Sequence, residues 1–122
     1  IEDYIIASDI GVYASEQESF GLSILETLAY GKPVVATAVG GIPEVVTHGQ
    51  TGILLPPRQP QALALAIDHL IDHPDDREKL GTAAQQDVAA RFNAQSIRER
   101  YLEFYHKLIQ SKLKSGVTTQ KV

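Results

Sequence analysis

The sequence predicts an α/β fold in which a partial parallel sheet is followed by C-terminal helices. Three short apolar segments in the first half of the chain are β-prone and end at turn signals, at residues 10–14, 33–37 and 52–55. Segments with helical character separate them, and this alternation is typical of a parallel sheet with right-handed crossovers. The second half of the chain is predicted to be helical throughout.

The elements of the first half follow one another closely. The strand at 10–14 leads to a helix at 22–30, whose leucines repeat at helical spacing and which ends before a glycine. Pro33 is compatible with the second strand because it stands at the first residue. A turn of two glycines precedes a short helix at 43–46, and two prolines stop the third strand.

The second half is predicted to form three helices, at 60–72, 75–91 and 93–112. The first and the third carry their apolar residues on one helical face. Pro74 breaks the chain between the first two helices.

The chain is expected to be a fragment of a longer protein. Three parallel strands are few for a freestanding domain, because both faces of such a sheet must be covered. The chain also opens without an initiator methionine. We therefore expect further strands upstream, and divide the chain into a part with strands and helices at 1–57, C-terminal helices at 58–112 and a flexible tail at 113–122.

Composition excludes several classes of protein. The 122 residues suffice for one small domain. A net charge of −4 argues against nucleic acid and anionic membranes as partners. The absence of cysteine excludes disulfides and thiolate metal sites, and no apolar run approaches the roughly 18 residues that span a bilayer.

The segment between the first strand and the first helix carries the candidate chemistry, because ligands of open parallel sheets bind at the carboxyl ends of the strands. Gly21 lets the backbone approach a ligand closely. The N–H groups of Gly21, Leu22 and Ser23 lie at a helix N-terminus and can bind a phosphate oxygen. Glu26, one turn further on, can accept hydrogen bonds from both ribose hydroxyls, and Glu18 can reach hydroxyls on whatever the phosphate carries.

A simpler interpretation stays open on spacing alone. Turns that contain Ser, Glu and Gly between a strand and a helix are common. A single glutamate in the first turns of a helix often only complements the helix dipole.

The residues of this segment and its neighbours resemble retaining glycosyltransferases of the GT-B architecture, family 4 (glycosyl transferases group 1). Glu18 and Glu26 bracket Ser-Phe-Gly-Leu-Ser-Ile-Leu, which resembles the E-x7-E motif of these enzymes. Residues 31–37, 40–44 and 49–56 are also similar to that family, and the resemblance extends from residue 1 to about residue 112. It implies a partial Rossmann-like sheet, the C-terminal half of a nucleotide-sugar-binding domain. Segment 15–21 also looks similar to enzymes that begin bacillithiol synthesis by glycosylating malate, although the segment is widely shared.

The resemblance implies a role for each matching position. Glu18 matches the first glutamate, the candidate catalytic residue, which in such enzymes hydrogen-bonds hydroxyls of the donor sugar. Ser19, Phe20 and Gly21 match the loop whose backbone amides face that sugar.

The positions that follow are implied to hold the nucleotide. Leu22 and Ser23 match the helix start, whose amides, and often a hydroxyl, contact the diphosphate. Glu26 matches the glutamate that binds the ribose. Family members retain the anomeric configuration by same-face displacement and generally need no metal ion, so we expect neither a cofactor nor a metal.

The charge around this site departs from what a diphosphate requires. The first 31 residues contain six acids and no Lys or Arg. A dianionic diphosphate needs cations nearby, because helix amides contribute only partial charge. In the family an Arg and a Lys from the earlier part of the domain supply them, so we expect the fragment alone to be inactive.

Two other sets of residues are candidates for sites. Residues 40–44, Gly-Gly-Ile-Pro-Glu, could form a second phosphate loop, although a tight turn and helix start near the site is the favoured interpretation. The four histidines lack metal-ligand spacing, so they are interpreted as solvated or capping residues: His48, His69, His73 and His106.

The expected partners are a nucleotide-sugar donor and the missing N-terminal acceptor domain, in a cytoplasmic enzyme. Without that domain, the apolar face of the last helix would be exposed and could drive homodimerisation. One alternative is an enzyme like the sugar-nucleotide 2-epimerases, which lack the Phe-Gly-Leu loop between two glutamates. The other is a non-catalytic folded or self-associating fragment that binds nucleotide weakly.

Overall fold

The computed structural model describes residues 2–17, 21–92 and 94–114. The chain divides into two compact units, Ile1–Ala90 and Arg91–Val122, which are considered separately below.

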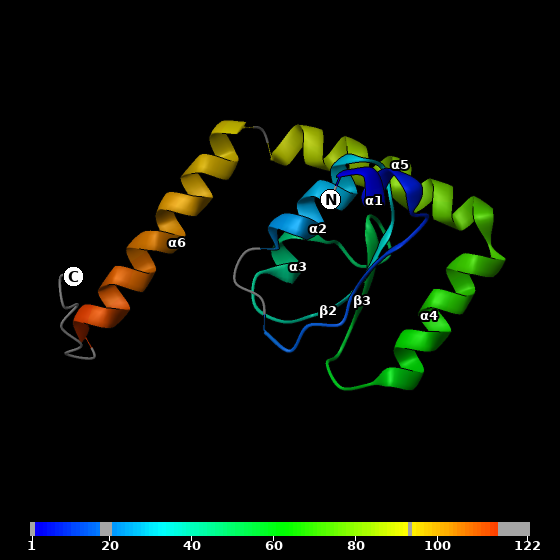
Figure 1. Cartoon of the computed structure of the whole chain (residues 1–122), viewed down its shortest axis with the longest axis horizontal. Helices are drawn as coiled ribbons and strands as arrows, with labels where there is room; N and C mark the ends of the chain where they lie inside the picture. The colour runs from blue at the N-terminus through cyan, green and yellow to red at the C-terminus, as the bar shows by residue number, and fades with distance from the viewer. Residues whose placement is uncertain (1, 18–20, 93, 115–122) are drawn as a thin grey trace. The chain divides into compact units, whose positions relative to one another are not determined.

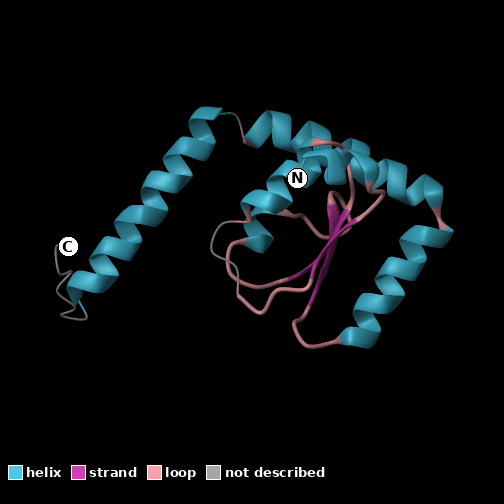
Figure 2. Ribbon diagram, in the orientation of Figure 1, coloured by secondary structure: helices cyan, strands magenta, loops and turns pink. Residues whose placement is uncertain are grey.

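The first unit is built on a three-stranded parallel sheet, as the sequence predicts. Strands β1 (Gly11–Tyr13), β2 (Val34–Thr37) and β3 (Gly52–Leu55) lie side by side in that order (Figure 1). Val35 of β2 pairs with Val12 on one side and with Ile53 on the other. All strands therefore end at the same edge of the sheet, and the loops that follow them leave from this edge (Figure 2).

Helices cover both faces of the sheet. Helix α2 (Leu22–Ala29) contacts β1 and β2, and the short α3 (Ile42–Val45) packs against α2. Helix α4 (Pro60–Asp72) contacts β2 and β3 from the opposite face (Figure 1). The side chains that these layers enclose are fully buried, among them Ile24, Leu28, Val34, Val35, Ile42, Val45 and Leu70.

Burial differs between the central strand and the edge strand. Every residue of β2 is buried, which is the pattern of a strand covered on both faces. Val12 of β1, in contrast, is 44% exposed. The sheet is thus fully covered at its centre and open at the β1 edge, among the residues described.

The sequence-based expectation misses one helix, and it places the start of another one residue too late. Helix α1 (Glu2–Ala7) is not predicted, because six residues are too short to show a helical repeat. Helix α5 (Pro74–Arg91) begins at Pro74 and not after it, because the first turn of a helix needs no N–H from its first residue. It crosses the amino-terminal edge of the sheet, where the Gln85 side chain donates to the carbonyl oxygen of Ala29 over 3.3 Å.

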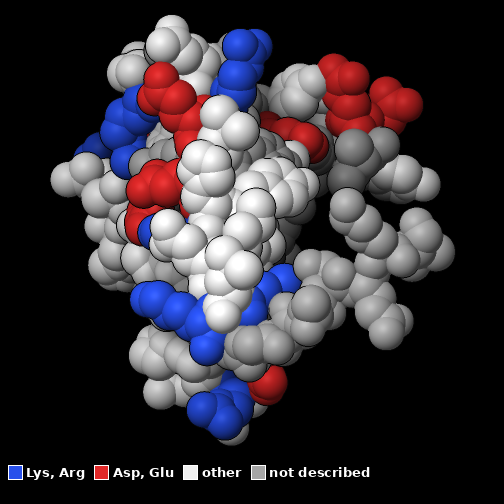
Figure 3. Space-filling model, turned by 90° about the vertical axis from the view of Figure 1, so that its left-hand side faces the viewer, with Lys and Arg blue, Asp and Glu red and all other residues white. Residues whose placement is uncertain are grey.

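The second unit contains one long helix, α6 (Ala94–Lys114), which runs two residues past its predicted end. Its described apolar side chains are largely exposed: Leu102, Tyr105, Leu108, Ile109 and Leu113. The side of the molecule that Figure 3 shows carries a band of uncharged side chains, with both basic and acidic side chains beside it.

Candidate functional site

The β1–α2 junction lies at the carboxyl edge of the sheet, and a glycine shapes its end. Gly21 caps α2 with φ of 75° and ψ of 37°, which is the left-handed conformation. Its carbonyl oxygen accepts the first helical hydrogen bond, from the N–H of Leu25 at 3.0 Å. Among the described residues, no side chain caps the helix. The first turn of α2 therefore turns its backbone N–H groups toward the loop at this edge.

The described candidate residues lie on the first turns of α2. Leu22 is half-buried, whereas Ser23 and Glu26 are exposed. Because Ser23 and Glu26 are three residues apart on a helix, their side chains lie on neighbouring positions of one face. The structure thus brings a hydroxyl, a carboxylate and a helix N-terminus together. The remaining three candidates, Glu18, Ser19 and Phe20, lie outside the described residues.

A hydrogen-bond network, in part buried, fixes α2 on the sheet. The Tyr13 hydroxyl lies 2.6 Å from Oγ1 of Thr27 and donates to the carbonyl oxygen of Ser23 over 3.1 Å. Oγ1 of Thr27 donates to the same carbonyl at 2.9 Å. These residues hold Ser23 in place from β1. Sequence analysis did not identify them, although Thr27 is a polar residue between apolar ones on the buried face, which is a signal that it has a partner.

Two further residues position the loop that follows β1. Oγ1 of Thr37, at the end of β2, donates to the carbonyl oxygen of Ser15 at 2.5 Å. A Cβ on Gly11 would lie 2.7 Å from Cγ2 of Thr27, so glycine allows the close approach of β1 and α2. The candidate site is therefore held by the second strand as well as by its own junction.

The glycine turn at 40–44 is a turn and helix start, as the favoured interpretation expects. Gly40 has φ of 54°, and the N–H of Ile42 donates to the carbonyl oxygen of Val39. Helix α3, which follows, contacts α2, so the turn lies in the element beside the candidate site. Glu44 is in the first turn of α3, where a carboxylate favours the helix dipole.

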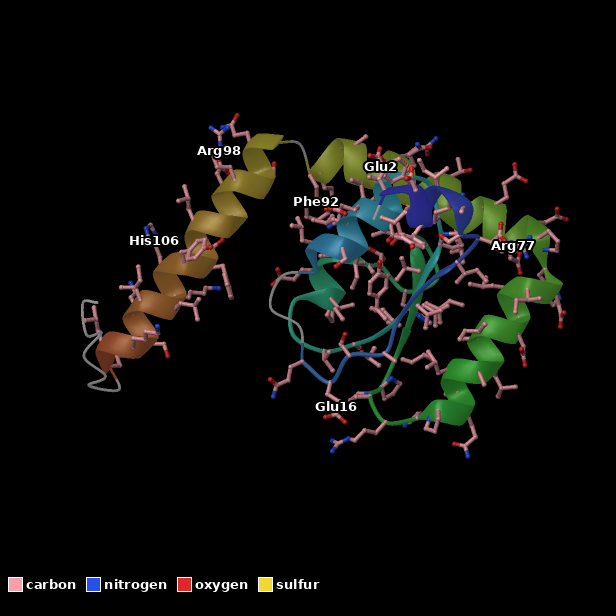
Figure 4. All side chains as sticks on the ribbon, in the orientation of Figure 1. Glu2, Glu16, Arg77, Phe92, Arg98 and His106 are labelled. Atoms are coloured by element: carbon pink, nitrogen blue, oxygen red, sulfur yellow. The ribbon has the colours of Figure 1, made fainter. Side chains whose placement is uncertain are left out.

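A cavity of about 170 Å³ opens at the same carboxyl edge of the sheet. It is lined by the ends of all three strands and by the β3–α4 loop, including Glu16, Thr37 and Arg58. Figure 4 shows Glu16 on this side of the unit and Glu2 and Arg77 on the other. Among the described residues that line it, Arg58 is the one basic residue, and it lies 27 residues beyond the acidic segment that ends at Gly31.

The histidines of the first unit have structural partners. Nδ1 of His48 accepts a hydrogen bond from the N–H of Leu54 at 3.0 Å, and Nε2 of His69 lies 2.9 Å from Oδ2 of Asp76. The ring of His73 stacks on that of His69 with centroids 4.2 Å apart, and its Nδ1 donates to the His69 carbonyl oxygen. Within the part of the chain that the structure describes, no three His, Asp or Glu side chains group as metal ligands would.

One titratable group away from the junction is perturbed. The Tyr30 hydroxyl donates to the Glu2 carboxylate, and this hydrogen bond, followed by desolvation and the nearby carboxylates, raises the pKa of Tyr30. The pair connects α1 to the end of α2 and so supports the fold.

Among the described helices, none combines the length and apolar character that crossing a bilayer requires.

Comparison with known proteins places this arrangement in a family. Residues 1–87 match the family described as glycosyl transferases group 1. The chain is 33% identical over 110 residues to N-acetyl-alpha-D-glucosaminyl L-malate synthase from Bacillus anthracis. The aligned region covers 90% of this chain and 29% of the relative.

Solved structures share the fold. Sucrose-phosphate synthase from Thermosynechococcus elongatus superimposes with a TM-score of 0.74 at 36% identity, over 88% of this chain and 27% of that one. HepE from Anabaena, solved in complex with UDP, gives a TM-score of 0.74 at 32% identity, over 85% of this chain and 29% of that one. The chain thus spans less than a third of the length of these proteins, and its α/β unit matches structures of the GT-B architecture. The chain belongs to the family of glycosyl transferases group 1.

Proposed function

We propose that the chain forms the donor-binding part of a retaining glycosyltransferase, which moves a sugar from a nucleotide-diphosphate sugar to an acceptor hydroxyl. The observation that carries the proposal is the exposed face of Ser23 and Glu26 beside the Gly21 cap, at the carboxyl edge of a parallel sheet. The complex of HepE with UDP, in a chain of the same fold, supports a nucleotide as the ligand.

Each side chain of the junction has a proposed role. The N–H groups of Leu22 and Ser23, with the Ser23 hydroxyl, bind diphosphate oxygens at the helix N-terminus. The Glu26 carboxylate accepts hydrogen bonds from the two ribose hydroxyls. Glu18 binds hydroxyls of the donor sugar, and the amides of Ser19 and Phe20 face that sugar together with Gly21.

The proposed reaction is a displacement on one face of the sugar. The bond from the anomeric carbon to the diphosphate breaks, and the acceptor oxygen bonds to the same face of that carbon. The acceptor proton passes to an oxygen of the leaving diphosphate. The step needs no metal ion, provided that cations from elsewhere in the protein stabilise the leaving group.

Nucleotide release by the full-length protein that contains this chain tests the proposal. It is measured with UDP-, GDP- and ADP-sugars for the wild type, Glu18→Gln and Glu26→Ala. We expect release from one donor, a fall in kcat of roughly 100-fold for Glu18→Gln, and a rise in donor KM of about tenfold for Glu26→Ala. Glu78→Gln is the charge-matched control, because the Glu78 side chain is exposed on α5, and this variant should behave as wild type. Release from no donor, or release indifferent to both glutamates, would show that the assignment is wrong.

The exposed apolar face of α6 favours a second candidate, a self-associating chain that binds nucleotide without turnover. Sedimentation of the 122-residue chain across a concentration series tests it. Self-association that Leu108→Glu abolishes, with weak nucleotide binding and no release by the full-length protein, would favour this candidate over the first.

A further inference from the structure

The cavity at the carboxyl edge of the sheet is not used by the proposed donor contacts. Its lining comes from the ends of the three strands, the β3–α4 loop and the start of α4, and includes Ser15, Glu16, Thr37, Arg58, Gln59 and Leu63. Its volume, about 170 Å³, is below the range of roughly 300–1,000 Å³ of cavities that enclose whole drug-sized ligands. It is therefore suited to one group of a substrate and is too small for a complete nucleotide sugar.

Arg58 has an unusual backbone conformation at this cavity. Its φ is 60°, and it is the one residue other than glycine with positive φ in the described part of the chain. A glycine would adopt this conformation without steric cost, whereas the Cβ of an arginine makes it unfavourable. Strain of this kind is often found where a side chain has a functional role.

The charge of Arg58 has no partner among the described residues. Its side chain makes no hydrogen bond or ion pair with any of them, and the same holds for Glu16 on the same cavity. The Thr37 hydroxyl, in contrast, already donates to the carbonyl oxygen of Ser15. Within the part of the chain that the structure describes, the cavity thus presents an exposed cationic donor and an exposed carboxylate acceptor that form no hydrogen bond or ion pair.

We propose that this cavity is a substrate subsite in which Arg58 binds an acidic group, a phosphate or a carboxylate, of a hydroxylated small molecule. The planar guanidinium can donate two parallel hydrogen bonds to such a group. Glu16 accepts a hydrogen bond from a hydroxyl of the same ligand. The inference rests on the proposed function, because it assigns a further substrate contact to the edge of the sheet at which the donor is proposed to bind. The acidic group comes either from the donor diphosphate or from the other substrate.

Titration calorimetry with inorganic phosphate tests the subsite in the full-length protein, with and without saturating UDP. Arg58→Gly is the sharpest variant, because it removes the guanidinium while relieving the backbone, so its thermal stability should not fall. We expect phosphate to bind the wild type and to bind Arg58→Gly roughly tenfold more weakly or worse. Lys79→Gln removes a positive charge from α5, away from this cavity, and should leave phosphate affinity unchanged.

The two sources of the acidic group give different results. If Arg58 serves the donor, UDP displaces phosphate, and Arg58→Gly weakens UDP binding by a similar factor. If it serves the other substrate, phosphate still binds the UDP-saturated protein, and UDP affinity is unchanged in the variant. Absence of phosphate binding in the wild type, or unchanged phosphate and UDP affinity in Arg58→Gly, would overturn the subsite. These measurements are of binding and do not depend on turnover. Nucleotide release that is unaffected by the substitutions at Glu18 and Glu26 would therefore count against the glycosyltransferase proposal without bearing on the subsite.

Discussion

At Gly21, φ is 75°, and an added Cβ would make no clash: the nearest atom, Cδ1 of Ile24, would lie 3.6 Å away, in ordinary van der Waals contact. An alanine would therefore be disfavoured by its backbone conformation alone. We expect Gly21→Ala to lower the free energy of unfolding by about 1–2 kcal/mol in chemical denaturation. Gly49→Ala is the matched control, because Gly49 has φ of 79° and open space around it. The two variants should lose similar stability, but only Gly21→Ala should weaken nucleotide binding. Equal binding by both would argue against close backbone approach at Gly21.

Tyr30 shows how a single hydrogen bond links stability to pH. The hydrogen bond to Glu2 is the largest cause of its raised pKa. Because the pKa is raised in the folded state, the stabilisation is complete below the usual tyrosine value of 10.0 and is lost as the pH rises through the folded-state pKa. In Glu2→Gln, an NMR titration of the Tyr30 ring should therefore give a lower pKa, and the variant should lose less stability at alkaline pH. An unchanged pKa would exclude the Glu2 carboxylate as the cause.

At the scale of elements, the crossing of α5 over the turn before β2 depends on two glycines. A Cβ on Gly81 would overlap the carbonyl oxygen of Gly31, which is backbone and cannot move aside cheaply. Replacing glycine by alanine inside a helix normally stabilises by about 1 kcal/mol. Here we expect Gly81→Ala to destabilise by about 1–3 kcal/mol in urea unfolding. Thr82→Ala, exposed on the same helix, should be neutral or slightly stabilising. Stabilisation by Gly81→Ala would show that the crossing is looser than described.

The elements also show how far periodicity carries a prediction. The bounds of α4 are predicted to the residue, since a proline opens it and its apolar side chains repeat over thirteen residues. Helix α1 escapes prediction because its six residues contain a single buried side chain, Ile5. The start of α5 differs because a proline both breaks a helix interior and suits a first turn, and only the packed structure shows which applies.

At the scale of the whole molecule, charge limits what this chain does alone. Its first 31 residues supply no Lys or Arg for a diphosphate, and Arg58 is the one basic residue among the described residues that line the cavity at the carboxyl edge. We therefore expect the 122-residue chain to show no nucleotide release under conditions in which the full-length protein turns over. A coupled assay on both proteins at equal concentration measures this, with circular dichroism to establish that the short chain is folded. Turnover by the short chain would contradict the expectation.

The sequence by itself determined the order of strands and helices from β1 onward, the parallel sheet and the E-x7-E motif with its family. These follow from local patterns: apolar runs, turn residues and the spacing of two glutamates along the chain. Only the tertiary structure decided that Tyr13 and Thr27 hold Ser23, that Thr37 holds the loop after β1, and that Arg58 shares a cavity with Glu16. Thr27 and Ser23 are neighbours on one helix, four positions apart, but the other partners are separated by 10 to 42 positions in the sequence. They meet because parallel pairing brings the carboxyl ends of all three strands to one edge, and no local pattern records such a contact.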